Sequence, residues 1–167
     1  MQQQRELAVL ADANPQARRM GCAYLSDLGW EVEAVGDGSA ALAALARRPQ
    51  LVLVDAALPG MPGASAQAWG GVELCRRVKA EAAATPVLIL LGAMARVPEA
   101  ELALADGVLR KPLSSAGLER WMQSSRQSST QTSAQASSGP AEAQDPELSP
   151  EAMLAAAIAA AARGERE

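Results

Sequence analysis

Three short apolar runs constrain the fold of this chain more than any other feature of its sequence. Leu7–Ala11, Leu51–Val54 and Val87–Leu91 consist of consecutive apolar residues, and each is bounded by polar residues or by proline. Runs of this length without a polar side are typical of strands that are buried on both faces. Such strands belong to parallel sheets that helices cover on both sides. The runs therefore predict an α/β protein.

Segments with a helical pattern separate these runs. Two weaker strands complete the series, since Glu31–Val35 alternates polar and apolar residues and Val108–Leu109 is a short apolar pair. Strands that alternate with helices form βαβ units, in which the connected strands are parallel. We therefore expect a doubly wound, five-stranded parallel sheet of the flavodoxin-like kind, with helices over residues 15–28, 39–47, 72–82, 99–105 and from Ser114 onward.

The composition changes after Met122, which marks the expected end of a domain over residues 5–122. Residues 123–148 are rich in Ser, Gln, Thr and Ala without an apolar period, so we expect a flexible, disordered linker there. A C-terminal helix is expected over residues 149–164, because Ser149 can cap it and Pro150 suits its first turn. One tethered helix cannot form a helix-turn-helix, so the expected output is a protein contact.

Composition narrows the possible functions. The chain contains no His, which excludes Ser-His-Asp catalysis and every metal motif that contains His. A net charge of −4 and an aromatic content of 2% do not favour a nucleic-acid partner. Cys22 and Cys75 form no CxxC motif and are expected to be buried, reduced thiols. With no signal peptide and no apolar run long enough to span a bilayer, we expect a cytoplasmic protein without a membrane partner.

Three charged residues stand at or just after predicted strand ends: Asp12, Asp55 and Lys111. The carboxyl ends of parallel strands meet at one edge of a doubly wound sheet, so we expect these side chains to lie together. A carboxylate is a fair nucleophile toward phosphorus, and carboxylates also hold hard divalent cations. A lysine can neutralise phosphoryl oxygens. The spacing therefore predicts a site for phosphoryl chemistry.

Several segments around these residues resemble one family. Asp55–Gly63 contains an aspartate followed by Leu-Pro-Gly, and Leu109–Leu113 contains Lys-Pro. Asp12–Pro15, with Arg18 beyond it, is an acidic turn before a predicted helix. Together with Gly71–Arg77 and Pro86–Leu90, all in this order, they are similar to the receiver domain of bacterial two-component response regulators. The resemblance covers the whole of the expected domain and implies the CheY-like fold.

The resemblance implies a role for each residue at the edge of the sheet. Asp55 would accept a phosphoryl group from a histidine kinase or a phosphotransfer protein, and Lys111 would contact the phosphoryl oxygen. The carboxylates of Asp12 and Asp55 and the backbone carbonyl of Ala57 would hold Mg²⁺. Such a domain is expected to have no dedicated catalytic activity. It would signal to a downstream protein partner through its receiver face or through the C-terminal helix.

The chain also departs from the family pattern. Ala13 stands where the family usually has a second acid, so we expect Mg²⁺ to bind weakly or not at all. The family usually has Ser or Thr after the fourth strand, and its hydroxyl binds the phosphoryl group and takes part in a conformational switch. Here the position is Leu91 or Gly92, and neither has a hydroxyl. Val108 stands where the family usually has the aromatic partner of that switch. Two hypotheses stay open: a phosphorylatable receiver, or a phosphorylation-independent pseudo-receiver that acts as a protein-interaction module. A small flavodoxin-like enzyme is a weaker third, because the chain lacks a Gly-rich phosphate loop and His.

Tryptophans and arginine pairs add further expectations. Residues 64–70 look like an insertion beside the site, and Trp69 is expected to cover the acidic edge or to anchor a partner. Trp30 and Trp121 are expected in the core. Arginine pairs on the predicted helices are interpreted as solvated helix faces: Arg18–Arg19, Arg47–Arg48 and Arg76–Arg77.

Overall fold

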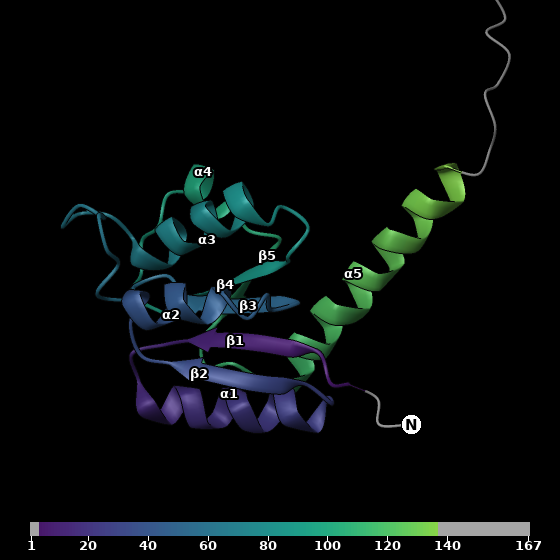
Figure 1. The fold of residues 1–167 in the computed structure, drawn as a ribbon, viewed down its shortest axis with the longest axis horizontal. Helices are drawn as coiled ribbons and strands as arrows, with labels where there is room; N and C mark the ends of the chain where they lie inside the picture. Colours follow the sequence, from purple (N-terminus) through teal and green to yellow (C-terminus); the bar gives the residue numbers. More distant parts are fainter. Residues whose placement is uncertain (1–3, 137–167) are drawn as a thin grey trace, which may run out of the picture. The chain divides into compact units, whose positions relative to one another are not determined.

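The computed structural model describes residues 4–136 of the chain (Figure 1). The chain divides into two units between Ser125 and Arg126. The fold described below is that of the first unit. Of the second unit the structure describes residues 126–136, which are the C-terminal part of one helix.

Five parallel strands form one sheet in the order β2-β1-β3-β4-β5, which confirms the predicted doubly wound sheet. The three apolar runs are the three central strands, and each of their residues except Asp55 is buried. The two weaker strands lie at the edges of the sheet, and their residues are partly buried or exposed to solvent. The strands are β1 Leu7–Ala11, β2 Glu31–Val35, β3 Leu51–Asp55, β4 Val87–Leu91 and β5 Gly107–Arg110.

Helices cover both faces of the sheet (Figure 1). They are α1 Pro15–Asp27, α2 Gly38–Leu45, α3 Gly70–Glu81, α4 Glu99–Leu102 and α5 Ser115–Ala136. The start of α1 follows from local chemistry, because Asn14 Oδ1 accepts hydrogen bonds from the backbone N–H of Gln16 and Ala17 and proline occupies the first turn. Asp37 caps α2 in the same way through the N–H of Ala40.

Alternation along the strands divides the core into two layers. On one face, Val9, Val54 and Ile89 pack with α2 and α3 residues such as Leu74. On the other face, the strand leucines pack with Leu25 of α1 and Leu118 of α5, and these residues are Leu10, Leu53, Leu88 and Leu90. Burial of apolar side chains on both faces stabilises the sheet and fixes the positions of its strand ends.

The tryptophans and cysteines lie largely as expected. Trp30 and Trp121 are partly buried against the α1–α5 layer, and Trp69 is partly buried against the α2–α3 layer. Cys75 is buried, whereas Cys22 is only partly buried, and both are free thiols. Burial raises the pKa of both thiols, so neither is an activated thiolate.

Most predicted helix and strand ends lie within two residues of the observed ones, and two boundaries differ by more. The predicted linker starts at Gln123, but α5 continues to Ala136, so the prediction is wrong for residues 123–136. Extending a formed helix is far easier than starting one, and no Gly or Pro interrupts the chain before Gly139. Helix α4 ends at Leu102, shorter than predicted. The rest of the predicted linker and the predicted helix over residues 149–164 lie outside the described residues.

Among the described residues, no helix is long and apolar enough to cross a membrane.

Candidate functional site

The carboxyl ends of β1, β3 and β5 bring together the three charged residues that the sequence singled out. Lys111 Nζ lies 2.6 Å from Asp12 Oδ2 and 2.7 Å from Asp55 Oδ2. The sheet order explains this meeting, because β1 and β3 are neighbours and Lys111 follows β5 on the same edge. The Lys111 ammonium therefore bridges the two carboxylates.

Asp12 is held almost completely inside the protein, with a side chain that is 1% exposed. Its Oδ1 accepts a hydrogen bond of 2.8 Å from the backbone N–H of Asn14. Its Oδ2 lies 2.6 Å from Lys111 Nζ in the ion pair, and apart from Lys111 this oxygen has no partner among the described residues. A buried carboxylate oxygen in this state is free to accept a further donor or a cation.

Asp55 is more accessible, with a side chain that is 15% exposed. Its Oδ1 accepts a hydrogen bond of 3.0 Å from the N–H of Ala57, and its Oδ2 accepts one of 2.7 Å from Lys111 Nζ. The start of α3 packs directly against this strand end: a Cβ on Gly71 would lie 2.2 Å from the Asp55 carbonyl oxygen. Glycine at this position therefore allows the helix to approach and support the loop that follows Asp55.

The pKa of Lys111 reflects two opposed effects. Burial of the ammonium lowers its pKa, but the hydrogen bonds and negative charges of Asp12 and Asp55 raise it more, so the pKa lies above its ordinary value. Lys111 therefore remains a cation throughout the neutral range. A permanent cation between two carboxylates suits a site that must receive additional negative charge.

The oxygen atoms at this edge also suit a hard cation such as Mg²⁺. Two carboxylates converge there, Asp12 Oδ2 has no partner other than Lys111 among the described residues, and the backbone carbonyl of Ala57 follows Asp55 by two residues. The donor set is small, because within the described residues no group of three or more His, Cys, Asp or Glu side chains could hold a metal. Ala13 supplies no side-chain oxygen. The residues present fit Mg²⁺, with a small set of hard oxygen ligands.

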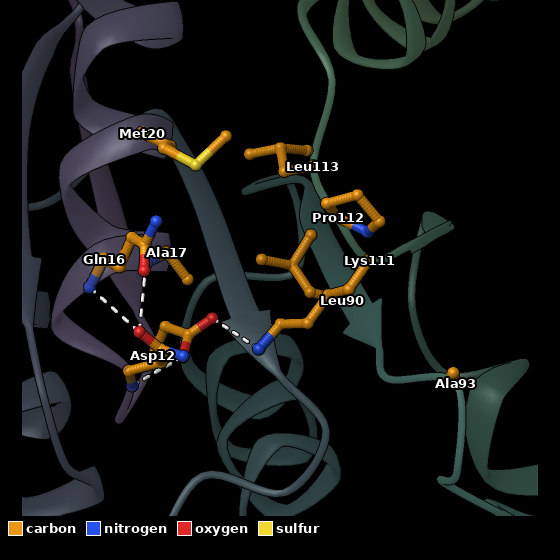
Figure 2. Close-up of a pocket in the computed structure, with 10 residues that line it drawn as sticks. Asp12, Gln16, Ala17, Met20, Leu90, Ala93, Lys111, Pro112 and Leu113 are labelled. Atoms are coloured by element: carbon orange, nitrogen blue, oxygen red, sulfur yellow. Dashed lines mark hydrogen bonds and ion pairs between the residues drawn. The ribbon is translucent and has the colours of Figure 1, made fainter.

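A pocket of about 410 Å³ opens beside the ion pair (Figure 2). Asp12 and Lys111 form its charged side. Asn14 and Gln16 add polar groups to the lining. Apolar side chains from α1, β4 and the segment after β5 form most of the remainder, among them Met20, Leu90 and Leu113. A ligand or partner side chain that enters here therefore meets an apolar wall on one side and the Lys111 ammonium on the other.

The positions that the sequence compared with the family's hydroxyl and aromatic residues lie on or beside β4 and β5, and they do not line this pocket. Leu91 is the last residue of β4 and is buried, and a Cβ on the following Gly92 would touch nothing within 4 Å. Val108 is exposed on β5. Trp69 lines a different hollow, formed by residues 57–70, and packs on the α2–α3 layer. The expectation that Trp69 covers the Asp12–Lys111 edge is therefore not met, because Trp69 does not line that pocket.

Sequence reasoning missed the role of Arg18 at this site. Arg18 Nη1 donates hydrogen bonds to the backbone carbonyls of Asp12, at 2.6 Å, and Ala13, at 3.1 Å. The interpretation of this arginine as part of a solvated face is therefore wrong, whereas its neighbour Arg19 is exposed. The sequence feature that could have indicated this role is the position of Arg18. It lies in the first turn of a helix that Asn14 caps, directly beside the acidic turn.

The fold and this edge of the sheet define a flavodoxin-like α/β protein with an acidic, lysine-bridged site, which is the arrangement of receiver domains. Residues 8–123 match the model of the response regulator receiver domain, and the chain belongs to this family. It is thus a module of two-component phosphorelay signalling, and receiver domains are in general signalling modules without enzymatic activity. Nothing in the comparisons favours the alternative of a pseudo-receiver.

Similar proteins include both regulators and single receiver domains. The DNA-binding response regulator MtrA of Mycolicibacterium smegmatis is 33% identical over 91 residues, which are 54% of this chain and 36% of MtrA. The chemotaxis response regulator CheY4 of Vibrio cholerae is 26% identical, with a TM-score of 0.59 over 72% of this chain and 98% of CheY4. The receiver domain of the sensor histidine kinase PA1611 of Pseudomonas aeruginosa PAO1, solved with a magnesium ion in its active site cleft, is 25% identical. Its TM-score is 0.58 over 72% of this chain and 96% of that domain. The match therefore spans about a third of MtrA but nearly all of the two solved receivers.

Proposed function

We propose that the chain accepts a phosphoryl group on Asp55 from the phosphohistidine of a histidine kinase or phosphotransfer protein and passes the signal on through protein–protein contacts. One observation carries the proposal: an accessible carboxylate at the end of β3 has one oxygen 2.7 Å from the ammonium of Lys111. The more deeply buried Asp12 is a poor acceptor, because its side chain is only 1% exposed.

The chemistry follows from the positions of these groups. A carboxylate oxygen of Asp55 attacks phosphorus, the bond between phosphorus and the partner's imidazole nitrogen breaks, and that imidazole takes up a proton. The product is a mixed anhydride on Asp55. Phosphoryl transfer relies on positioning and charge stabilisation, and Lys111 provides a cation at the place where the phosphoryl oxygens arrive. Its raised pKa keeps it charged during the transfer.

Asp12, Asp55 and the backbone carbonyl of Ala57 are the groups that would hold Mg²⁺. When bound, Mg²⁺ supplies positive charge to the phosphoryl oxygens. The magnesium ion in the cleft of the PA1611 receiver supports this assignment, and the matching feature of this chain is Asp12 Oδ2, which has no partner other than Lys111 among the described residues. Ala13 in place of an acid leads us to propose a lower Mg²⁺ affinity than in a site with three acids.

A small phosphodonor tests the proposal. The full chain is incubated with acetyl phosphate and Mg²⁺, and its intact mass is measured before and after treatment with hydroxylamine, which cleaves acyl phosphates. We expect an adduct of one phosphoryl group that hydroxylamine removes. Asp55→Asn should abolish the adduct, because the amide is a much weaker nucleophile.

The matched control is Asp27→Asn, which makes the same chemical change at an exposed aspartate at the end of α1. This variant should be labelled like the wild type. An adduct that persists in Asp55→Asn would show that another residue is the acceptor. A wild-type chain that gains no adduct, while its circular dichroism shows a folded protein, would contradict the proposal as a whole.

A further inference from the structure

Arg18 occupies an enclosed position under the turn that carries Asp12. Its backbone N–H bonds the carbonyl of Asn14 in the first turn of α1, and its guanidinium extends back to the turn. Gly36, which follows β2, lies on the other side: a Cβ there would stand 3.1 Å from Arg18 Nη1. The guanidinium therefore fits between the turn and the end of β2, where a larger residue at position 36 would crowd it.

The contacts of Arg18 complete the hydrogen bonding of this turn. Asp12 N–H donates to the carbonyl of Val35 at 3.0 Å, and Asp12 Oδ1 accepts from Asn14 N–H at 2.8 Å. Arg18 Nη1 binds the carbonyls of Asp12 and Ala13. The backbone and one carboxylate oxygen are thus held, and Asp12 Oδ2 is left to face Lys111 and the site.

The composition of the turn makes this support important. With an acid at position 13, a bound cation would contact the side chains of residues 12 and 13 and would thereby help to order the turn. Ala13 has no side-chain oxygen, so only Asp12 can contact the cation from this turn. The order of the turn must therefore come from the protein itself. Groups that orient a metal-binding carboxylate typically change metal affinity by about 10–100-fold when they are removed.

We infer that Arg18 is a positioning residue: by binding the carbonyls of Asp12 and Ala13 it orients the Asp12 carboxylate for the cation that accompanies phosphorylation of Asp55. The inference rests on the proposed function. Arg18 touches neither Asp55 nor Lys111 in the hydrogen bonds and ion pairs described above, so it acts through Asp12.

The sign of the effect separates positioning from simple electrostatics. Removing a positive charge near the site should by itself tighten the binding of a divalent cation, because a repulsive charge is lost. Loss of positioning should weaken that binding. A weaker Mg²⁺ affinity after neutralisation of Arg18 is therefore a result that charge alone does not give.

Isothermal titration of the full, unphosphorylated chain with MgCl₂ tests the inference. We expect Arg18→Gln to raise the Kd for Mg²⁺ about tenfold or more. Arg18→Lys should give a smaller increase, because an ammonium keeps the charge but lacks the planar fork of donors. Arg19→Gln, which removes the same charge from the exposed neighbour, should leave the affinity unchanged or slightly tighter.

Each outcome is decisive. A Kd for Arg18→Gln that equals that of the wild type or of Arg19→Gln would overturn the inference, as would a wild-type chain that binds no Mg²⁺. If Arg18→Gln fails to fold by circular dichroism, the comparison of Arg18→Lys with the wild type decides. The titration requires no phosphorylation, so a failure of the acetyl phosphate experiment contradicts the proposed function separately.

Discussion

Replacing Lys111 with methionine should leave two carboxylates facing each other at the edge of the sheet. The ammonium lies 2.6 Å from Asp12 Oδ2 and 2.7 Å from Asp55 Oδ2, and Asp12 is 1% exposed. Methionine retains an unbranched side chain of similar size without the charge. We expect a lower free energy of unfolding, because a buried carboxylate loses its counter-ion.

The magnitude follows from the two contacts. At these distances each attraction amounts to about 6 kcal/mol at an effective dielectric constant of about 20. Desolvation of the charges offsets much of this attraction, and loss of one partner from a buried pair costs about 3–5 kcal/mol. The Lys111 side chain is 22% exposed, which favours the lower value. We expect a loss of about 3 kcal/mol, which corresponds to a decrease in Tm of roughly 10 °C.

The pH dependence adds a direction to the prediction. On the alkaline side, burial lowers the pKa of Lys111 but its carboxylate partners raise it more, to above its ordinary value. The contribution of Lys111 is thus fully present below the ordinary lysine pKa. It is lost as the pH rises through the higher folded-state pKa.

Urea unfolding followed by tryptophan fluorescence measures the effect, since Trp30 and Trp121 are partly buried in the folded unit. Arg76→Met is the control: Arg76, whose side chain is 54% exposed, forms an ion pair of 2.7 Å with Glu73 on the same helix. Its loss should cost at most about 1 kcal/mol. The reasoning would be refuted if Lys111→Met were as stable as Arg76→Met at neutral pH.

Two further substitutions test the same edge of the sheet. Ala13→Asp restores the missing acid, and isothermal titration should show Mg²⁺ bound more tightly, on the order of tenfold; an unchanged Kd would mean that residue 13 does not face the cation. Gly71→Ala places a Cβ 2.2 Å from the carbonyl oxygen of Asp55 and should cost about 3 kcal/mol in urea unfolding. Gly92→Ala meets nothing within 4 Å and should be nearly neutral, so equal effects of the two would contradict the packing argument.

Much of the fold could be predicted because its signals are local. An apolar run of four or five residues is typical of a strand that is buried on both faces, and all three runs are central strands of the sheet. Asn14 followed by Pro15 starts α1 through contacts within four residues. The end of α5 was predicted less well, because Ser, Gln and Ala permit either helix or linker and the established helix decides between them.

The three charged residues of the candidate site could be predicted from the topology of the sheet. Parallel strands present their carboxyl ends at one edge, so Asp12, Asp55 and Lys111 had to meet there once the strands were recognised. Arg18 could not be assigned in this way. Its contact with the Asp12 carbonyl depends on the direction in which α1 leaves the turn and on the room beside Gly36, and the helical pattern of α1 contains neither.

The sequence by itself determined the strands, most of the helices, the doubly wound sheet and the identity of the three charged residues, because periodicity and strand ends are properties of short segments. Only the tertiary structure decided which atoms meet: Lys111 Nζ bridges two carboxylates, one of them 56 residues away in the chain, and Trp69 packs against the α2–α3 layer and not over the site. Such contacts depend on how whole helices and strands pack against one another. The complete core fixes their relative orientation, and the sequence of one segment does not contain it.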